Sequence, residues 1–333
     1  MLDFGLVALG FAILILAGDV LVRGAVNLSL RLGVPVLIVS LTIVAIGTSA
    51  PELLIAVASV LEGAPGIALG NVVGSNTANV LLVLGVPAML AGLATAEFDT
   101  RTSYVQMIAA TLLFLVAAWF APISWLWGLL LIAVFALFIG HAAFAALKHK
   151  RPEAGAPATG GDDEPAREAE ADREIAARTA MMHPAMIALM LVLGLIGLPV
   201  GADILVNGAT AVARNFGMSE TVIGLTLVAV GTSLPELATT VTAAFRGQAD
   251  VALGNVIGSN TANLLGIVGI AALFGPIPVP ADIFRFEIVA MALASILVAP
   301  FVLGPVNLTR RWGLLFFLGY IAYLVAVLYG GHG

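Results

Sequence analysis

Two acidic residues lie where the surrounding sequence is otherwise apolar. Glu52 and Glu236 each sit inside a long apolar stretch, and Glu52 comes 18 residues after Val34, where its stretch begins. An ionised carboxylate in such a stretch costs several kcal/mol or more if the stretch crosses a membrane. A helix-end carboxylate or a protonated packing residue is the plain explanation. Both glutamates, however, end the same motif, Gly-Thr-Ser-x-Pro-Glu, at 47–52 and 231–236, and this duplication favours a functional role.

The same motif predicts that its helix breaks just before the glutamate. Its proline lacks an N–H and clashes with the preceding turn, and its glycine is a poor helix former. The predicted break lies at Thr48-Ser49 in the first copy and at Thr232-Ser233 in the second. A break leaves main-chain carbonyls unpaired, among them those of Ala45 and Ala229. In lipid such groups are tolerated only where they line a cavity or meet an ion.

A second duplicated motif follows each glutamate. Gly-Asn-x-x-Gly-Ser-Asn-x-x-Asn occupies 70–79 and 254–263. Its serine and last asparagine are four residues apart, so they share one helix face, and its glycines permit close helix packing. These face residues are Ser75, Asn79, Ser259 and Asn263. Hydrogen bonding between helices without ion contact is the alternative for the stripe, above all for Asn71, Asn76, Asn255 and Asn260.

Every candidate ligand atom in these motifs is oxygen. The set contains carboxylates, hydroxyls, amide oxygens and freed carbonyls, from Glu52, Glu236, Thr48, Thr232, Ser49, Ser233, Ser75, Ser259, Asn79, Asn263, Ala45 and Ala229. Oxygen ligands suit hard cations such as Ca²⁺ and Na⁺. The chain has no cysteine, and its four histidines lie near the ends of apolar stretches or in tails, so a soft-metal site is not expected. No nucleophile–base constellation or HExxH motif supports an enzyme, and no cofactor is expected.

The elements that must position these residues follow from composition. Of 333 residues, 61% are apolar and only 10% are charged. A soluble domain carries about a quarter charged residues, so this chain has too little polar surface for a water-soluble globule. A disordered chain and a disulfide scaffold are excluded as well. The net charge of −6 and only 14 Lys and Arg residues argue against nucleic acid as a partner. The remaining class is an all-α polytopic membrane protein in a lipid bilayer, with no obligatory protein partner evident.

Ten apolar stretches are long enough to span a membrane, which takes about 20 residues each. We expect these spans at 5–22, 34–61, 67–90, 104–121, 125–147, 184–213, 221–245, 251–274, 286–303 and 312–329. The polar stretch 148–183 is typical of a flexible linker between two halves, with a regulatory element as the alternative. Of the 14 Lys and Arg residues, 12 fall on the linker's side of the ten spans. This bias predicts a cytoplasmic linker and both termini outside.

The two halves of the chain are copies of each other. Both duplicated motifs recur at one offset of 184 positions. Each half holds five predicted spans, and an odd number means that the second copy enters the membrane upside down. We therefore expect two inverted five-helix repeats with broken helices at the ion site. They are 1–147, with its motif region at 44–85, and 184–333, with its motif region at 228–269.

Together, these motifs resemble the two alpha-repeats of the sodium/calcium exchanger superfamily, specifically of its prokaryotic calcium/sodium antiporters. The likeness covers nearly the whole chain. It implies that Glu52 and Glu236 are the central calcium ligands, shared with sodium and completed by Asn79 and Asn263. It also implies that Thr48 and Thr232 bind calcium through main-chain oxygens. Flanking sodium sites would be formed by Ser49, Ser75, Ser233, Ser259 and the carbonyls of Ala45 and Ala229.

The resemblance implies a secondary antiporter that exchanges Na⁺ for Ca²⁺ by alternating access in a bacterial or archaeal cytoplasmic membrane, normally extruding Ca²⁺. Spans one and six would slide across the remaining core. Asp19 and Arg23, on span one, are spaced for an ion pair within the helix. Asn263 stands where the potassium-dependent branch carries Asp, and the Gly-Asn-x-x-Glu signature of the proton-coupled branch is absent. The alternative function is H⁺-coupled or K⁺-dependent antiport of Ca²⁺, and a cation channel is a candidate from a different class of transport protein.

Overall fold

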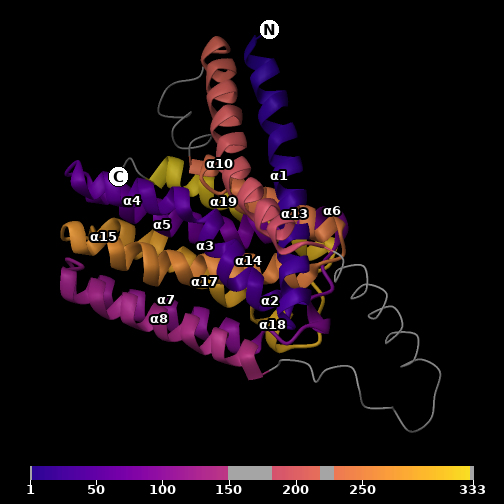
Figure 1. The fold of residues 1–333 in the computed structure, drawn as a ribbon. Helices are drawn as coiled ribbons and strands as arrows, with labels where there is room; N and C mark the ends of the chain where they lie inside the picture. Colours follow the sequence, from indigo (N-terminus) through magenta and orange to yellow (C-terminus); the bar gives the residue numbers. More distant parts are fainter. Residues whose placement is uncertain (1, 149–181, 218–228, 331–333) are drawn as a thin grey trace.

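The computed structural model describes residues 2–148, 182–217 and 229–330, and in these ranges the chain is helical apart from turns and two isolated antiparallel bridges (Figure 1). Eight described helices are long and apolar enough to cross a membrane, and one bent pair adds a ninth. They correspond to nine of the ten predicted spans. The tenth, at 221–245, lies partly outside the described ranges, and its described portion is α13 (Leu234–Phe245). The linker residues 149–181 are outside them as well.

Two long helices pack against each other in antiparallel fashion and extend beyond the rest of the bundle (Figure 1). They are α1 (Leu2–Leu32) and α10 (Pro184–Asn215). A Cβ added to Gly194 would lie 2.6 Å from the Leu21 Cβ, so glycine is what allows the two backbones this close. At about 1.5 Å per residue, 31 and 32 residues exceed the roughly 30 Å of a bilayer core, so both helices must tilt or project.

α1 is longer than the predicted span at 5–22. The polar residues after Val22 suggested an early end, but nothing in them breaks a helix. The helix continues until Gly33, whose φ of 69° is favourable for glycine and ends it. The extension is supported by an ion pair between Arg23 and Asp19, at 2.9 Å, which confirms the pairing expected from their spacing.

The helix breaks lie where the motif predicts them. The first broken span consists of α2 (Val36–Val39), the π-helical η1 (Ser40–Val44), α3 (Ala45–Thr48) and α4 (Ala50–Leu61), with a bend of 42° before α4. In the second copy, α12 (Ala229–Gly231) is separated from α13 by a turn. Ser49 and Ser233 leave helical geometry at ψ 7° and 4°, because the prolines two residues later cannot continue the preceding hydrogen-bond ladder.

The two spans that carry the second motif form the centre of the molecule. In the most apolar 18-residue window of each helix, 78% of the residues are buried in Pro65–Ala91 and 89% in Ala249–Phe274. In the other six unbroken spans this share is at most 39%. Each begins as an α-helix, turns π-helical at its last asparagine or just before it, and ends α-helical. The segments are α5 (Pro65–Ala78), η2 (Asn79–Leu84), α6 (Gly85–Ala91), α14 (Ala249–Thr261), η5 (Ala262–Ile267) and α15 (Val268–Phe274).

The remaining helices cover this centre. α19 (Arg310–Gly330) packs on α6, and α8 (Trp125–Lys148) packs on α15. The others are η3 (Thr95–Glu97), α7 (Arg101–Trp119), α16 (Ala281–Ile283), η6 (Phe284–Ile288), α17 (Val289–Leu297) and α18 (Ala299–Leu303). Large apolar side chains stay exposed on their outer faces, for example Leu137 at 69% and Leu293 at 57%. Such surfaces suit lipid rather than water.

Several local features recur at the 184-residue offset. α4 and α13 have the same bounds after this shift. Gly63 and Gly247 are shifted partners with φ of 76° and 70°, and Gly33 and Gly217 are partners with φ of 69° and 79°. The duplicated sequence therefore adopts matching local conformations in both halves.

Candidate cation site

The two glutamates meet at the centre of the described structure. Glu52 and Glu236 are each only 1% exposed, and their carboxyl groups are close enough to interact electrostatically. The hydroxyl of Ser49 donates a hydrogen bond of 3.1 Å to Glu236 Oε1, so the first break contacts the second glutamate directly. The Oε2 atoms of both glutamates are buried without a hydrogen-bond partner.

The helix breaks explain how carboxylates are accommodated here. Glu52 and Glu236 lie in the first turn of α4 and of α13. A helix N-terminus has free N–H groups and a partial positive charge, both of which stabilise a nearby carboxylate. Continuous helices would place each carboxylate mid-span without this compensation. The break thus provides both the position and part of the electrostatic compensation.

The end of α3 forms one wall of the site. Thr48 Oγ1 lies 3.2 Å from the Ala45 carbonyl oxygen and 3.3 Å from Asn255 Oδ1, so its one proton can serve either acceptor. The Ser259 hydroxyl donates to the same Ala45 carbonyl at 3.4 Å. The structure therefore brings together the predicted ligands Ala45, Thr48 and Ser259, and joins them to Asn255.

Asn255 connects the two broken spans. It is fully buried, and its Nδ2 donates to Thr240 Oγ1 at 3.1 Å and to the Glu236 main-chain oxygen at 3.4 Å. Its Oδ1 accepts from Thr48. The hydrogen bonds of Asn255 all run to other helices, as expected if it joins helices without contacting an ion. Thr240 was missed, since nothing in its sequence position marks it as part of the site.

Three asparagines of the second motif are joined where α14 contacts α5 and the start of η2. Asn79 Nδ2 donates to Asn260 Oδ1 at 3.0 Å, and Asn260 Nδ2 donates to the Asn76 main-chain oxygen at 3.3 Å. Asn79 Oδ1 is left without a partner, as are both side-chain polar atoms of Asn263 and the hydroxyl of Ser75. These residues are between 0% and 3% exposed.

Several predicted ligand oxygens are therefore buried and unpaired within the described residues. They belong to Glu52, Glu236, Ser75, Ser233, Asn79 and Asn263. Leaving one such atom unpaired costs about 1–3 kcal/mol, so this many unpaired oxygens on the broken and central spans favour a ligand that they hold in common. Two carboxylates with neutral oxygens fit a hard cation. In the described part of the chain, no three His, Cys, Asp or Glu residues lie together in a group that could hold a metal ion, so any cation here would need neutral oxygens as further ligands.

The second break is less enclosed than the first. Thr232 is half-buried, whereas its repeat partner Thr48 is 1% exposed. Thr232 and Pro51 line a cavity of about 180 Å³ that also reaches the exposed Asp203 on α10. Of Ala229, only the backbone at the start of α12 is described, and the role expected for its carbonyl stays a prediction.

An ion pair that the sequence did not predict joins α1 to the end of α13. Asp19 pairs with Arg246, just after α13, as well as with Arg23; the Arg246 Nε lies 2.7 Å from Asp19 Oδ1. Arg246 and Asp19 are 227 positions apart, so no local pattern could pair them. The repeat partners are Asp203 and Glu62, and two acids cannot form the equivalent pair.

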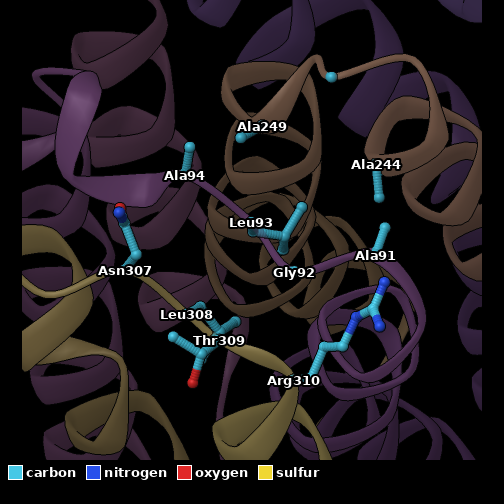
Figure 2. A pocket seen from close by; sticks show the side chains of 11 residues that line it. Ala91, Gly92, Leu93, Ala94, Ala244, Ala249, Asn307, Leu308, Thr309 and Arg310 are labelled. Carbon is cyan, nitrogen blue, oxygen red and sulfur yellow. The ribbon is translucent and has the colours of Figure 1, made fainter.

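A pocket of about 480 Å³ lies elsewhere, among the loops that surround the Leu93–Leu308 bridge (Figure 2). Figure 2 shows Arg310 and Asn307 on its rim. None of the predicted ligands lines it. Most of the predicted ligands are instead among the buried residues of the central helices.

The fold defines a helical integral membrane protein, and buried, partly unpaired oxygen atoms gather on its two broken spans and its two central spans. The profile of the family described as sodium/calcium exchanger protein matches residues 2–144 and 186–329, which is most of the chain. The chain therefore belongs to the sodium/calcium exchanger family.

Individual relatives agree with this membership. The chain is 34% identical to the sodium/calcium exchanger MaX1 of Methanosarcina acetivorans, over 98% of this chain and 99% of that protein. It is 36% identical to the putative antiporter CaxA of Alkalimonas amylolytica, over 81% and 80%. A solved structure of the sodium-calcium exchanger NCX_Mj superimposes with a TM-score of 0.76, at 29% identity, covering 98% of this chain and 99% of that one.

Proposed function

We propose that this chain is a secondary antiporter that exchanges Na⁺ for Ca²⁺ by alternating access at the central site. The observation that carries the proposal is the pair of buried glutamates, Glu52 and Glu236, surrounded by unpaired oxygens. Their two negative charges match one dehydrated Ca²⁺. A full set of Na⁺ would need the same oxygens, so the two ions exclude each other, which is the requirement for antiport. Transport of ions, rather than catalysis, is what this arrangement supports.

The ligand assignment follows the resemblance, residue by residue. Ca²⁺ would be held by Glu52 and Glu236, with Asn79, Asn263 and the main-chain oxygens of Thr48 and Thr232. Na⁺ would occupy flanking positions built from Ser49, Ser75, Ser233, Ser259 and the carbonyls of Ala45 and Ala229. Burial and the unpaired oxygens support most of this set. No resident cofactor is needed, and no partner protein is part of the proposal.

The architecture proposed is ten spans in two inverted five-helix repeats, 1–147 and 184–333. The matching bounds of α4 and α13 support the repeat. So do the two antiparallel bridges, Leu93–Leu308 and Ile123–Ile277. Leu93 and Ile277 are repeat partners at the 184-residue offset, and the partner of Ile123 is position 307, directly before Leu308. The two bridges therefore join corresponding positions of the two halves to within one residue. Inversion follows from the odd number of spans per half.

The orientation proposed has the linker in the cytoplasm and both termini outside, in the cytoplasmic membrane of a prokaryote. The bias of Lys and Arg toward the linker's side supports it. Export of Ca²⁺ driven by the Na⁺ gradient is the direction that an inward Na⁺ gradient would impose. If more than two Na⁺ exchange per Ca²⁺, each net charge is worth about 2.3 kcal/mol per 100 mV of membrane potential.

Alternating access would be a sliding of α1 and α10 over the other helices. Their extensive mutual packing supports movement as one unit. The cavity beside Asp203 is also lined by Pro51 and Thr232, next to the two breaks, which supports ion access from that side. Near the middle of α1, the Asp19–Arg246 contact holds this helix against the end of α13.

The test is Ca²⁺ uptake into proteoliposomes loaded with Na⁺. Uptake should require the outward Na⁺ gradient and fall to background when K⁺ or choline replaces Na⁺ inside. Equal uptake without Na⁺ that follows a pH gradient would select H⁺-coupled antiport, and a requirement for K⁺ alongside Na⁺ would select the K⁺-dependent alternative. Ca²⁺ flux that is indifferent to any counter-ion would indicate a channel.

A further inference from the structure

Asn260 makes two hydrogen bonds from one central span to the other. It is fully buried on α14, and the two ends of its side-chain amide bond to α5 and to the first residue of η2. Its Nδ2 donates to the main-chain oxygen of Asn76 at 3.3 Å, and its Oδ1 accepts from Asn79 Nδ2 at 3.0 Å. These two bonds form a relay from a main-chain carbonyl to the proposed ligand Asn79.

The direction of this relay follows from its anchor. A main-chain carbonyl only accepts hydrogen bonds, so Asn260 must turn its Nδ2 toward Asn76. The Oδ1 of Asn260 then faces Asn79, which must donate a hydrogen bond to it from its own Nδ2. The Asn79 oxygen is left at the opposite end, buried and unpaired. Turning the Asn79 amide over would set oxygen against oxygen at Asn260 and present N–H groups to a cation.

The repeat partner of Asn260 does not do the same for Asn263. Asn76 stands at the equivalent position, but its Nδ2 donates to Val72 of its own helix at 2.7 Å. Both side-chain polar atoms of Asn263 lack partners within the described residues. The two ligand asparagines therefore differ: the amide of Asn79 is held in one orientation, and the amide of Asn263 is not.

We propose that Asn260 is a positioning residue that fixes the Asn79 amide with its oxygen toward the transported cation, which makes Asn79 and Asn263 unequal ligands. This inference rests on the proposed function, because it takes Asn79 as a ligand. Asn260 acts through Asn79 and does not itself contact the ion. Asn79 is ready before the ion arrives, whereas Asn263 is oriented by the ion.

The first test replaces Asn260 by an apolar residue of similar size. Asn260→Leu removes the relay, and the loss of one neutral hydrogen bond predicts a rise of about fivefold in the KM for Ca²⁺ uptake with little change in maximal rate. Asn76→Leu is the matched control, since it leaves the Asn76 main-chain carbonyl in place and removes a buried amide whose one hydrogen bond is to Val72 of its own helix. Equal increases in KM for the two variants would overturn the proposal, because they would indicate a general packing effect.

The second test uses the symmetry of a carboxylate. Asn79→Asp presents oxygen at both ends, so it needs no fixed orientation. In that background Asn260→Leu should raise the KM no further, whereas a purely structural defect would add its full effect. Asn260→Ser, whose side chain cannot reach both partners, allows the same comparison if the leucine variant does not assemble.

The outcomes separate this inference from the proposed function. Asn79→Ala should strongly impair Ca²⁺ uptake if Asn79 is a ligand at all. Normal uptake by Asn79→Ala would contradict the ligand assignment on which the inference rests. Impaired uptake by Asn79→Ala, together with an unchanged KM in Asn260→Leu or an equal loss in both Asn79 backgrounds, would overturn the positioning role alone.

Discussion

Removing the hydroxyl of Thr240 should weaken Ca²⁺ transport although Thr240 is not a proposed ligand. Thr240 Oγ1 accepts from Asn255 Nδ2 at 3.1 Å, and both residues are fully buried. Asn255 in turn contacts Thr48 at the first break and the main chain of Glu236 beyond the second. Thr240→Val keeps the shape of the side chain and deletes the acceptor, so Asn255 keeps only a long contact of 3.4 Å for its N–H groups.

The expected magnitude follows from one buried hydrogen bond. A neutral bond contributes about 1 kcal/mol net, and a buried donor left unpaired costs about 1–3 kcal/mol. The remaining contact to Glu236 offsets part of that cost, so we expect a loss near 1 kcal/mol, or about fivefold in the KM for Ca²⁺. The first repeat shows the alternative arrangement: Ala56 stands at the position of Thr240, and Asn71 Nδ2 there has no partner.

The assay is Ca²⁺ uptake into Na⁺-loaded proteoliposomes over a range of Ca²⁺ concentrations. Thr240→Ser retains the hydroxyl but loses the methyl group, so it separates hydrogen bonding from packing. We expect the serine variant to behave like the wild type and the valine variant to show the raised KM. A wild-type KM in Thr240→Val, or the same increase in both variants, would refute a role for this hydrogen bond.

Two further predictions concern the α1–α10 pair. Arg246→Gln removes one partner of Asp19, and this pair, about one-third exposed, contributes roughly 0.2–1 kcal/mol. We therefore expect an impermeant maleimide to label Val206→Cys, in the Asp203 cavity, about twofold more slowly in the Arg246→Gln variant. No slowing, or equal slowing in the control Arg23→Gln, would show that this contact does not hold the access state. Gly194→Val should destabilise the protein by about 1–3 kcal/mol in thermal unfolding in detergent, because the new Cβ would lie 2.6 Å from the Leu21 Cβ. Gly5→Val is the control, since a Cβ at Gly5 has no atom within 4 Å, and equal stability of the two variants would count against the close packing.

Much of the site could be predicted from the sequence because its signals are local. Proline and glycine beside Glu52 and Glu236 predict the breaks through backbone chemistry alone, and the structure places both breaks there. The four-residue spacing of Ser75 and Asn79 fixes a shared helix face. The scarcity of charge makes the two mid-span glutamates conspicuous. Each of these inferences needs only a few neighbouring residues.

The rest depends on which faces meet, and periodicity does not contain that information. Ser49 donates to Glu236, which lies 187 positions away, and Asp19 pairs with Arg246 across 227 positions. Thr240 has no motif to mark it, although it supports Asn255. The length of α1 was also underestimated, because polar residues beyond Val22 look like a loop even where nothing stops the helix.

The central claim is that the Glu52 and Glu236 carboxylates jointly hold the transported cation. Its most direct test is Na⁺-dependent Ca²⁺ uptake by Glu52→Gln and Glu236→Gln, with Glu62→Gln, an exposed acid just after α4, as the control. Glutamine keeps the size of the side chain and removes one of the two charges. We predict that uptake is abolished in both site variants, with folded protein retained, and is unchanged in the control. Wild-type exchange by either site variant would contradict the account.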